Sequence, residues 1–315
     1  MSRIDIALPE EQRGEGEHRQ QHGRERGSSV FGFQACGSHV KITAQPHGRT
    51  VLPSIIAIRY YPPAVPQGYP RKARKVELME AHSTRIRTEM LNSLELTGRA
   101  DTHVSPLDEL SCALHPEAAA AFGSLRSAAR ADGIDLTIVS AFRAFRRQEA
   151  LWNGKFTAER PLYDRSGAEV SRADLADDAA LVDAILIWSA LPGASRHHWG
   201  TDFDVADLAA VPAGYRPQLV PQEYAVGGCF EKLDRWLTAN MGKYGFFRPY
   251  RRDRGGVQPE AWHLSFAPVA LPALESLSLE VLREAISGAQ MWGREAVLAR
   301  LPELYERYVR TVDGP

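Results

Sequence analysis

Two histidines and two carboxylates stand in a pattern that suits a catalytic metal site. Residues 192–208 (PGASRHHWGTDFDVADL) place His197 seven positions before Asp204, with Gly200 between them. A loop with a histidine, a turn at glycine and a strand with an aspartate can return an imidazole and a carboxylate to one point. Taken alone, this pair is also compatible with an ordinary surface loop.

A second segment, residues 259–266 (PEAWHLSF), carries Glu260 and His263 on either side of Trp262. If His263 is a third ligand, zinc has two imidazoles and one carboxylate, and a fourth position stays open for water. Glu260 could then reach that water without binding the metal. This is the division of labour in a metallohydrolase, where the metal acidifies water and a carboxylate moves its proton.

A third segment, residues 139–152 (VSAFRAFRRQEALW), places Arg143 directly after a predicted buried strand. The end of a strand can deliver a side chain into a cleft. A guanidinium fixed there could neutralise the oxyanion of a tetrahedral intermediate. Taken alone, an ordinary ion pair is the simpler interpretation of Arg143.

The elements that must position these residues are short strands mixed with unequal helices. We expect strands at 134–142, 201–205 and 262–266, and helices at 114–129, 145–156, 181–188 and 230–244. Gly133 and Gly245 end two of these helices. The tail from residue 277 is helical, and Pro302 splits its apolar stripe into two helices. This pattern predicts an α+β fold rather than a regular βαβ repeat.

Composition excludes several classes of protein. The chain has 315 residues, of which 44% are hydrophobic, and 38 Lys and Arg nearly balance 39 Asp and Glu. This balance argues against nucleic-acid binding through a basic surface, and no apolar run reaches the ~20 residues that span a bilayer. Cys36, Cys112 and Cys229 form no CxxC pair, which excludes a disulfide framework and argues against a thiolate zinc cluster.

Together the three segments resemble the metallopeptidase family of D-alanyl-D-alanine carboxypeptidases and dipeptidases, which includes the vancomycin-resistance enzymes. That family carries Ser-x-x-Arg, then Ser-x-His-x-x-Gly-x-x-x-Asp, then Glu-x-Trp-His. The matching residues here, in the same order, are Ser140, Arg143, Ser195, His197, Gly200, Asp204, Glu260, Trp262 and His263. The resemblance covers roughly residues 107–268, about half of the chain.

The resemblance implies a role for each central residue. His197, Asp204 and His263 would bind one Zn²⁺ per chain. Glu260 would act as general base and then as acid for the leaving amine. Arg143 would bind the scissile carbonyl and stabilise its developing charge.

The resemblance implies supporting roles for residues around this centre. Ser195, Gln148 and Ser140 would contact the substrate, and Trp262 would support the ligands from behind. His198 has no place in the family pattern, so we interpret it as a neighbour of the site rather than a ligand.

Two residues depart from the family pattern. Asp202 stands where many members have a small apolar residue, and it should face the same side of its strand as Asp204. It could orient a ligand imidazole, raise cation affinity, or indicate a related endopeptidase branch. Arg196 often has an acidic counterpart, and a cation beside the cleft would favour anionic substrates.

The composition and the extent of the resemblance together predict a domain organisation. Residues 1–29 would be a disordered leader, 30–105 an N-terminal extension and linker, 106–270 the zinc peptidase domain and 271–315 a helical extension. The peptidase domain should have a small antiparallel sheet with flanking helices that form a zinc cleft, as in the hedgehog and DD-peptidase fold.

The expected function is zinc-dependent removal of the terminal D-Ala from peptidoglycan stem peptides. The alternatives are a D-Ala-D-Ala dipeptidase, a peptidoglycan endopeptidase of the L-Ala-D-Glu type, and a non-catalytic zinc-binding module. Arg147, Arg196 and Arg248 are the available partners for a terminal carboxylate. The leader as written lacks a signal peptide and favours the cytoplasm, whereas the substrate would suit the periplasm or cell wall.

Overall fold

A four-stranded antiparallel sheet lies at the centre of the structure, a computed structural model that describes residues 90–315. Its strands are, in spatial order, β3 (Leu136–Ser140), β6 (Asp202–Asp207), β8 (His263–Phe266) and β7 (Phe246–Phe247). The predicted α+β class, with a small antiparallel sheet and flanking helices, is confirmed. The predicted leader and most of the N-terminal extension lie outside the described residues.

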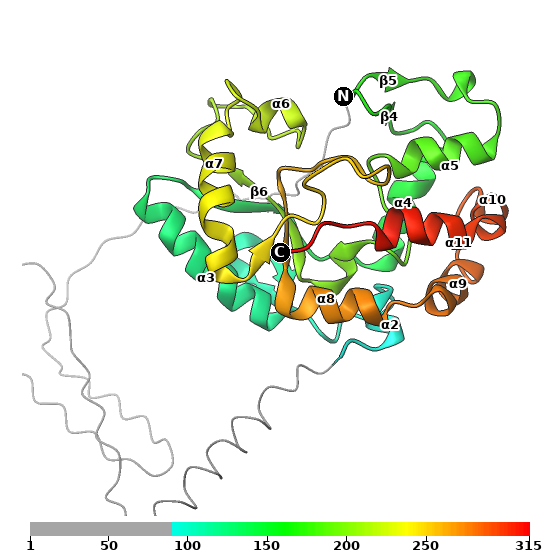
Figure 1. Ribbon diagram of the computed structural model, residues 1–315, viewed down its shortest axis with the longest axis horizontal. Coiled ribbons are helices and arrows are strands. Elements are labelled where there is room, and N and C mark those ends of the chain that lie inside the picture. Colours follow the sequence, from blue (N-terminus) through cyan, green and yellow to red (C-terminus); the bar gives the residue numbers. More distant parts are fainter. Residues whose placement is uncertain (1–89) are drawn as a thin grey trace, which may run out of the picture. The chain divides into compact units, whose positions relative to one another are not determined.

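One face of the sheet packs against helices α3 (Pro116–Ala131) and α7 (Glu231–Asn240). Phe203 and Val205 of β6 and Leu264 of β8 are fully buried in this core. Because side chains alternate along a strand, the residues between them face the opposite side of the sheet. Figure 1 shows α3 and α7 next to the sheet.

Helix α3 begins later than the apolar spacing predicts. Leu114 belongs to β2 (Cys112–Leu114), which forms a hairpin with β1 (Ser105–Leu107). The His115 side chain caps the helix by accepting a hydrogen bond from the backbone N–H of Glu117. Pro116 occupies the first turn, where a backbone N–H would have no partner within the helix, so the missing N–H of proline costs nothing. The helix therefore begins at residue 116.

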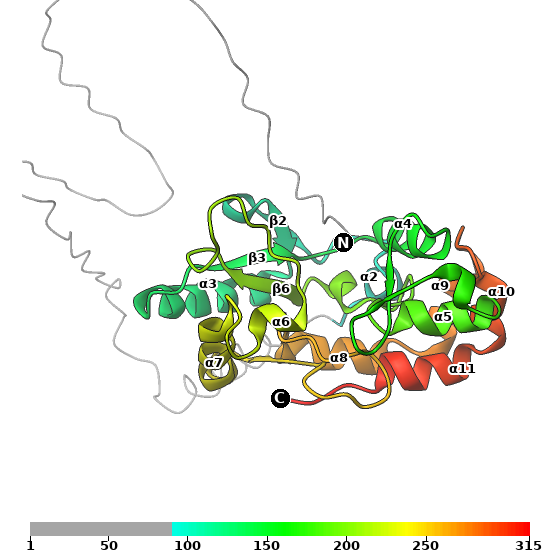
Figure 2. The same ribbon diagram turned by 90° about the horizontal axis from the view of Figure 1, so that it is seen from above.

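A second core joins the middle of the chain to its C-terminal helices. These are α4 (Phe145–Phe156), α5 (Asp178–Leu186), α8 (Ala267–Ser276), α9 (Leu279–Ser287), α10 (Arg294–Ala299), α11 (Leu301–Leu304) and the π-helical turn η5 (Tyr305–Arg310). Figures 1 and 2 both show α4, α5 and α9 to α11 gathered at the same end of this part of the chain. The domain boundaries remain predictions, but the helices after residue 270 share their core with α4 and α5.

Most predicted elements are present with small shifts in their bounds. Helix α4 has the predicted bounds, and Pro302 stands in the first turn of α11, so the split at this proline is confirmed. Helix α5 ends before Trp188, and the expected 230–244 helix is α7 followed by a 3-10 turn, η4 (Met241–Tyr244). Helix α8 was not predicted, because Pro272 within it argues against a helix.

The remaining short elements connect these layers. They are α2 (Ser93–Leu96), η1 (Asp108–Leu110), β4 (Leu162–Tyr163), β5 (Glu169–Val170), η2 (Arg172–Asp174), η3 (Arg196–Trp199) and α6 (Pro221–Tyr224). Cys112 and Cys229 are free thiols. Within residues 90–315, every helix is too short or too polar to cross a membrane.

Candidate metal centre

The face of the sheet opposite α3 and α7 is polar and buried. On it, Asp204 of β6 lies directly opposite His263 of β8, and Asp202 lies opposite Ser265. Each of the four is at most 6% exposed. Directly opposed residues of antiparallel strands have their Cβ atoms about 5 Å apart, so the register alone brings a carboxylate against an imidazole.

His197 reaches this face from η3, through a turn that requires glycine. Gly200 ends η3 with φ of 65°, and a Cβ there would lie 2.4 Å from a side-chain carbon of Val104. The His197 Nδ1 lies 2.9 Å from the carbonyl oxygen of Ala141, which requires a proton on that nitrogen. Its Nε2 is therefore unprotonated, and it lies 3.6 Å from Asp204 Oδ2.

The donor atoms of His197, Asp204 and His263 all lie within 4.8 Å of one another. Two of these atoms, Asp204 Oδ1 and His263 Nδ1, are buried without a hydrogen-bond partner. Buried polar atoms are rarely left unpaired, and a divalent cation between the three side chains would satisfy both. Two imidazoles and one carboxylate are the donor set of a catalytic zinc site, so the residues present fit the metal.

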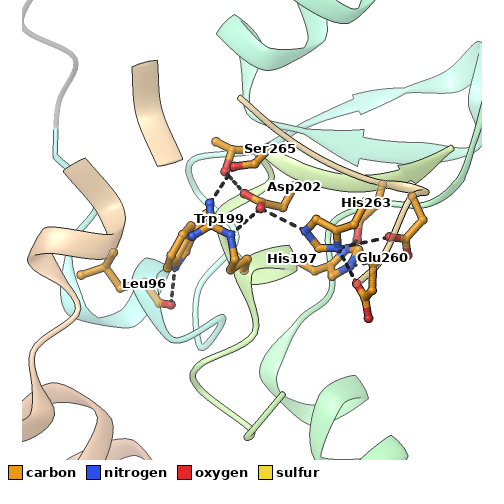
Figure 3. Close-up of polar contacts among 11 residues, drawn as sticks. Leu96, His197, Trp199, Asp202, Glu260, His263 and Ser265 are labelled. Atoms are coloured by element: carbon orange, nitrogen blue, oxygen red, sulfur yellow. Dashed lines mark hydrogen bonds and ion pairs between the residues drawn. The ribbon is translucent and has the colours of Figure 1, made fainter. Parts of the chain in front are cut away.

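Asp202 lies behind this centre and holds one of its imidazoles (Figure 3). Its Oδ1 accepts hydrogen bonds from His263 Nε2 at 3.1 Å and from Arg196 Nε at 2.7 Å, and its Oδ2 accepts one from Thr201 at 2.7 Å. With Nε2 protonated and donating, the other nitrogen of His263 is left to face the metal site. Such contacts fix the tautomer and orientation of a metal ligand.

Arg196 does not line the cleft, which corrects the expectation that its charge would favour anionic substrates. Its side chain is 4% exposed, donates from Nη2 to Ser265 Oγ at 2.6 Å and stacks on the Trp199 ring at 4.7 Å. Because Asp202 neutralises it within the protein, Arg196 has no charge to offer a substrate.

The pKa values of the centre follow from burial and from these contacts. Burial lowers the pKa of His197 to about 3. Burial opposes ionisation of Asp202, but Arg196 and His263 outweigh it and lower the pKa of this carboxyl to about 2. Burial also opposes protonation of His263, but the surrounding carboxylates of Asp202, Asp204 and Glu260 raise its pKa well above its usual value. Carboxylates therefore surround the donor atoms, and their charge favours a cation there.

Glu260 stands at the edge of the centre, in the turn before β8. Its side chain is 13% exposed, and Oε2 lies 3.3 Å from His263 Nδ1. Its backbone N–H donates to the carbonyl oxygen of Tyr250 at 2.8 Å, which anchors the turn. Burial raises the pKa of Glu260, and a raised pKa suits a carboxylate that must both take and give a proton near neutral pH.

Arg143 is held at the same centre by two predicted site residues. It donates from Nη1 to Gln148 Oε1 at 2.8 Å and from Nη2 to Ser140 Oγ at 3.1 Å. A guanidinium has five N–H donors, so three remain. The Gln148 amide in turn donates to Ala190 O at 2.7 Å. Ser140 and Gln148 therefore position Arg143 here, and their contact with substrate stays a prediction.

A bulge in β3 brings Ser140 to the polar face. Ile138 pairs with Val205, but Ser140 pairs with Asp204, so the register shifts by one residue between them. A bulge of this kind re-aims the following side chain. Without it, Ser140 would lie opposite Phe203 and face the hydrophobic core.

Three other predicted residues lie further from the donor atoms. His198 is fully buried, with Nε2 accepting from the N–H of Gly193 and Nδ1 donating to the carbonyl oxygen of Arg143, so it holds the backbone and is not part of the cluster. Trp262 packs its ring against Tyr224 in the core on the other face of the sheet. Ser195 is buried directly before η3, and its role stays a prediction.

Sequence reasoning missed Lys155, a half-buried residue near the end of α4. Its ammonium donates to Ser189 Oγ at 2.7 Å. The available signal was its spacing: Lys155 follows Gln148 by seven residues, two turns of helix, and so lies on the same face. A lysine near a helix C-terminus is ordinarily a solvated end residue. Spacing alone does not distinguish such a lysine from one that lies beside the site.

Comparison with known proteins assigns the family. The family model of VanY, D-alanyl-D-alanine carboxypeptidase, matches residues 111–269, about half of the chain. This chain belongs to the VanY family. The resemblance inferred from the three motifs is thereby confirmed, and with it the class of enzyme, a zinc metallopeptidase. The matched range includes all the residues of the metal centre.

Two relatives in this family show how far the likeness extends. An uncharacterized protein of Haemophilus influenzae is 34% identical over 121 residues, which cover 38% of this chain and 92% of that protein. A D-alanyl-D-alanine carboxypeptidase of Enterococcus faecalis is 27% identical over 148 residues, 46% of this chain and 45% of that protein.

Solved structures with a similar arrangement include two VanY proteins. One is VanYB in complex with D-alanine-D-alanine, with a TM-score of 0.39, 21% identity and coverage of 61% of this chain and 92% of that one. The other is a mutant VanY D,D-pentapeptidase from a VanB-type resistance cassette in complex with Zn(II), with a TM-score of 0.38, 22% identity and coverage of 62% and 90%. The family assignment rests on the sequence match.

Proposed function

We propose that this VanY-family protein is a zinc-dependent carboxypeptidase that removes the terminal D-Ala from peptidoglycan stem peptides. The observation that carries the proposal is the convergence of His197, Asp204 and His263, with the Glu260 carboxylate 3.3 Å from the nitrogen that faces the site. The name of the enterococcal relative supports a peptide ending in D-Ala as the substrate.

One Zn²⁺ per chain would be held by His197 Nε2, His263 Nδ1 and the Asp204 carboxylate. When bound, a divalent cation at these donors supplies Lewis acidity, lowering the pKa of water and polarising a carbonyl. The chain contributes the orientation of the donors. Ala141 fixes the tautomer of His197, and Asp202 fixes that of His263.

Glu260 would act as the proton carrier. Its carboxylate is close enough to the centre to accept a proton from the attacking water, and its raised pKa lets it hold that proton. It would then give the proton to the nitrogen of the departing D-Ala. General acid–base catalysis of this kind contributes about 10²- to 10⁴-fold to a rate.

Arg143 would stabilise the negative charge that develops on the scissile carbonyl oxygen. Ser140 and Gln148 fix its guanidinium from two sides, so its free N–H groups are oriented before the substrate arrives. Donors that need no reorganisation during the reaction are the effective ones.

The test is to incubate the zinc-loaded protein with a UDP-linked muramyl pentapeptide and to identify the products by mass spectrometry. Release of one D-Ala supports the proposal, whereas release of D-Ala-D-Ala would make the protein a dipeptidase. Cleavage of cross-linked peptidoglycan alone would favour an endopeptidase. If zinc binds and neither substrate is cleaved, a non-catalytic module is favoured. The Glu260→Ala variant serves as the control for contaminating peptidases.

A further inference from the structure

Lys155 is a cation near the centre without an acidic partner. Its ammonium donates to the Ser189 hydroxyl, and it forms no ion pair with any Asp or Glu in residues 90–315. Two of the three arginines first considered for a substrate carboxylate are already paired with acids. Arg196 is paired with Asp202 at 2.7 Å and Arg248 with Asp234 at 2.9 Å.

The location of Lys155 follows from the contacts of α4. Gln148 donates to the carbonyl oxygen of Ala190, and Lys155, two turns later on the same helix, donates to the adjacent Ser189. This face of α4 therefore runs along the segment after α5, from Gln148, which holds Arg143, to Lys155 two turns later.

The same segment contacts the turn that carries Glu260. The backbone N–H of Gln258 donates to the carbonyl oxygen of Ile187 at 3.0 Å, two residues before Ser189. Residues 187–190 therefore contact both α4, through Gln148 and Lys155, and the segment that leads to Glu260. Burial lowers the pKa of Lys155 to about 8, while the charge of Glu260 raises it and that of Arg143 lowers it.

The charges of the site leave a place for an anion. Arg143 and Lys155 balance Asp204 and Glu260, so a divalent cation at the three ligands adds positive charge that no side chain of this group offsets. A half-buried ammonium without a counterion is incompletely hydrated, which favours an anion beside it. A peptide substrate carries a carboxylate, which can supply that counterion.

We propose that the Lys155 ammonium, with the Ser189 hydroxyl beside it, binds a carboxylate of the peptide substrate. The inference rests on the proposed peptidase function and adds the residue that selects an anionic peptide. This carboxylate is either the C-terminal carboxylate of the D-Ala that leaves or the free carboxylate of the D-glutamyl residue. Both offer the same acceptor oxygens.

The test is a binding measurement on the zinc-loaded full chain carrying Glu260→Gln, which prevents turnover. Isothermal titration would use three stem pentapeptides: the free acid, the same peptide with a terminal amide, and the same peptide with the D-glutamyl carboxylate amidated. We expect one amide to bind about 10- to 100-fold more weakly than the free acid, as for the loss of a charged hydrogen bond. The amidated peptide that binds more weakly shows which of the two carboxylates Lys155 binds.

In the same background, Lys155→Met should weaken binding of the free acid by that factor and remove the difference between acid and amide. Lys155→Arg should restore part of the preference. Lys243→Met, at an exposed lysine of η4, is the matched control and should change nothing. Zinc affinity, measured by competition with a chelator, should be the same in all these variants.

Two results would overturn the inference. In the first, the protein that retains Lys155 binds the free-acid peptide and both amidated peptides equally, or binds none of the three peptides. In the other, Lys155→Met weakens acid and amide to the same extent, as a structural defect would. The proposed function is tested separately with native Glu260. If that protein cleaves no peptide but prefers the acid through Lys155, the carboxypeptidase proposal fails and this one stands.

Discussion

Nε of Arg196 lies 2.7 Å from Oδ1 of Asp202, and the same oxygen accepts a hydrogen bond from His263 Nε2 at 3.1 Å. Arg196 and Asp202, the two residues that the sequence analysis singled out as departures from the expected motif, therefore form one buried ion pair. The pair accounts for the two residues together, because a buried carboxylate is costly without a cation against it. It also connects η3 to a ligand of the metal centre.

The first prediction concerns the stability of this pair. Asp202→Ala leaves the Arg196 guanidinium buried and unpaired, and it should lower the free energy of unfolding by about 3–5 kcal/mol. The double variant Arg196→Met with Asp202→Ala should lose less than the single variant, since no charge is stranded. Urea unfolding of the unaltered protein, Asp202→Ala, Arg196→Met and the double variant gives the coupling free energy between the two residues. Additive effects would show that the pair is not energetically linked.

The second prediction separates the metal ligand from the proton carrier. His263→Ala removes a donor and should lose both zinc and turnover. Glu260→Ala should keep zinc and lose about 10²- to 10⁴-fold in kcat, because its carboxylate is expected to act on the substrate and not on the metal. Zinc content after dialysis and kcat are measured on both variants. Equal loss of zinc in the two would refute the assignment of roles.

The third prediction concerns how Arg143 is positioned. Arg143→Ala should reduce kcat about 10²- to 10³-fold with zinc retained. Gln148→Leu should cost less, because Ser140 still holds the guanidinium. Arg146→Ala, at an exposed position of α4, is the control on the same helix. A rise in KM with kcat unchanged in Arg143→Ala would instead indicate uniform substrate binding.

The fourth prediction concerns the C-terminal tail and pH. Asp313 is 1% exposed and accepts hydrogen bonds from the backbone N–H groups of Arg251 and Arg252 and from the Arg252 guanidinium. Burial opposes its ionisation, but these bonds prevail and lower its pKa. The stability that it contributes is therefore complete above the ordinary pKa of Asp, about 4, and is lost as pH falls through the lower native value.

Asp313→Asn should accordingly cost about 1.5–3 kcal/mol at pH 7, and the difference from the unaltered chain should shrink below about pH 4. Urea unfolding at pH 7 and at pH 3 measures both. Asp174→Asn, at an exposed residue of η2, is the control. A difference that stays constant down to pH 3 would contradict the role given to this carboxylate.

Local patterns in the sequence predicted most of the helices, and the order of three motifs predicted the ligand set. Helix α4 has its predicted bounds because its apolar residues repeat at helical spacing. His197, Asp204 and His263 were expected as ligands from the resemblance of the three motifs to the family pattern, and their donor atoms lie within 4.8 Å of one another. Gly200 between the first two predicted the turn that joins them. Helix α8 was missed because Pro272 is a local signal against a helix, whereas its buried face is a property of the whole core.

The sequence by itself determined which residues could bind a metal and carry a proton, since that depends on residue type and short spacing. Only the tertiary structure decided how they are paired. Arg196 was expected to face a substrate, but the register of β6 against β8 places Asp202 and Ser265 where they bind it. Lys155 became visible only where α4 packs on the segment after α5. Such contacts join residues far apart in the chain. The local spacing of residues therefore does not predict which charged side chains pair with one another when the elements pack together.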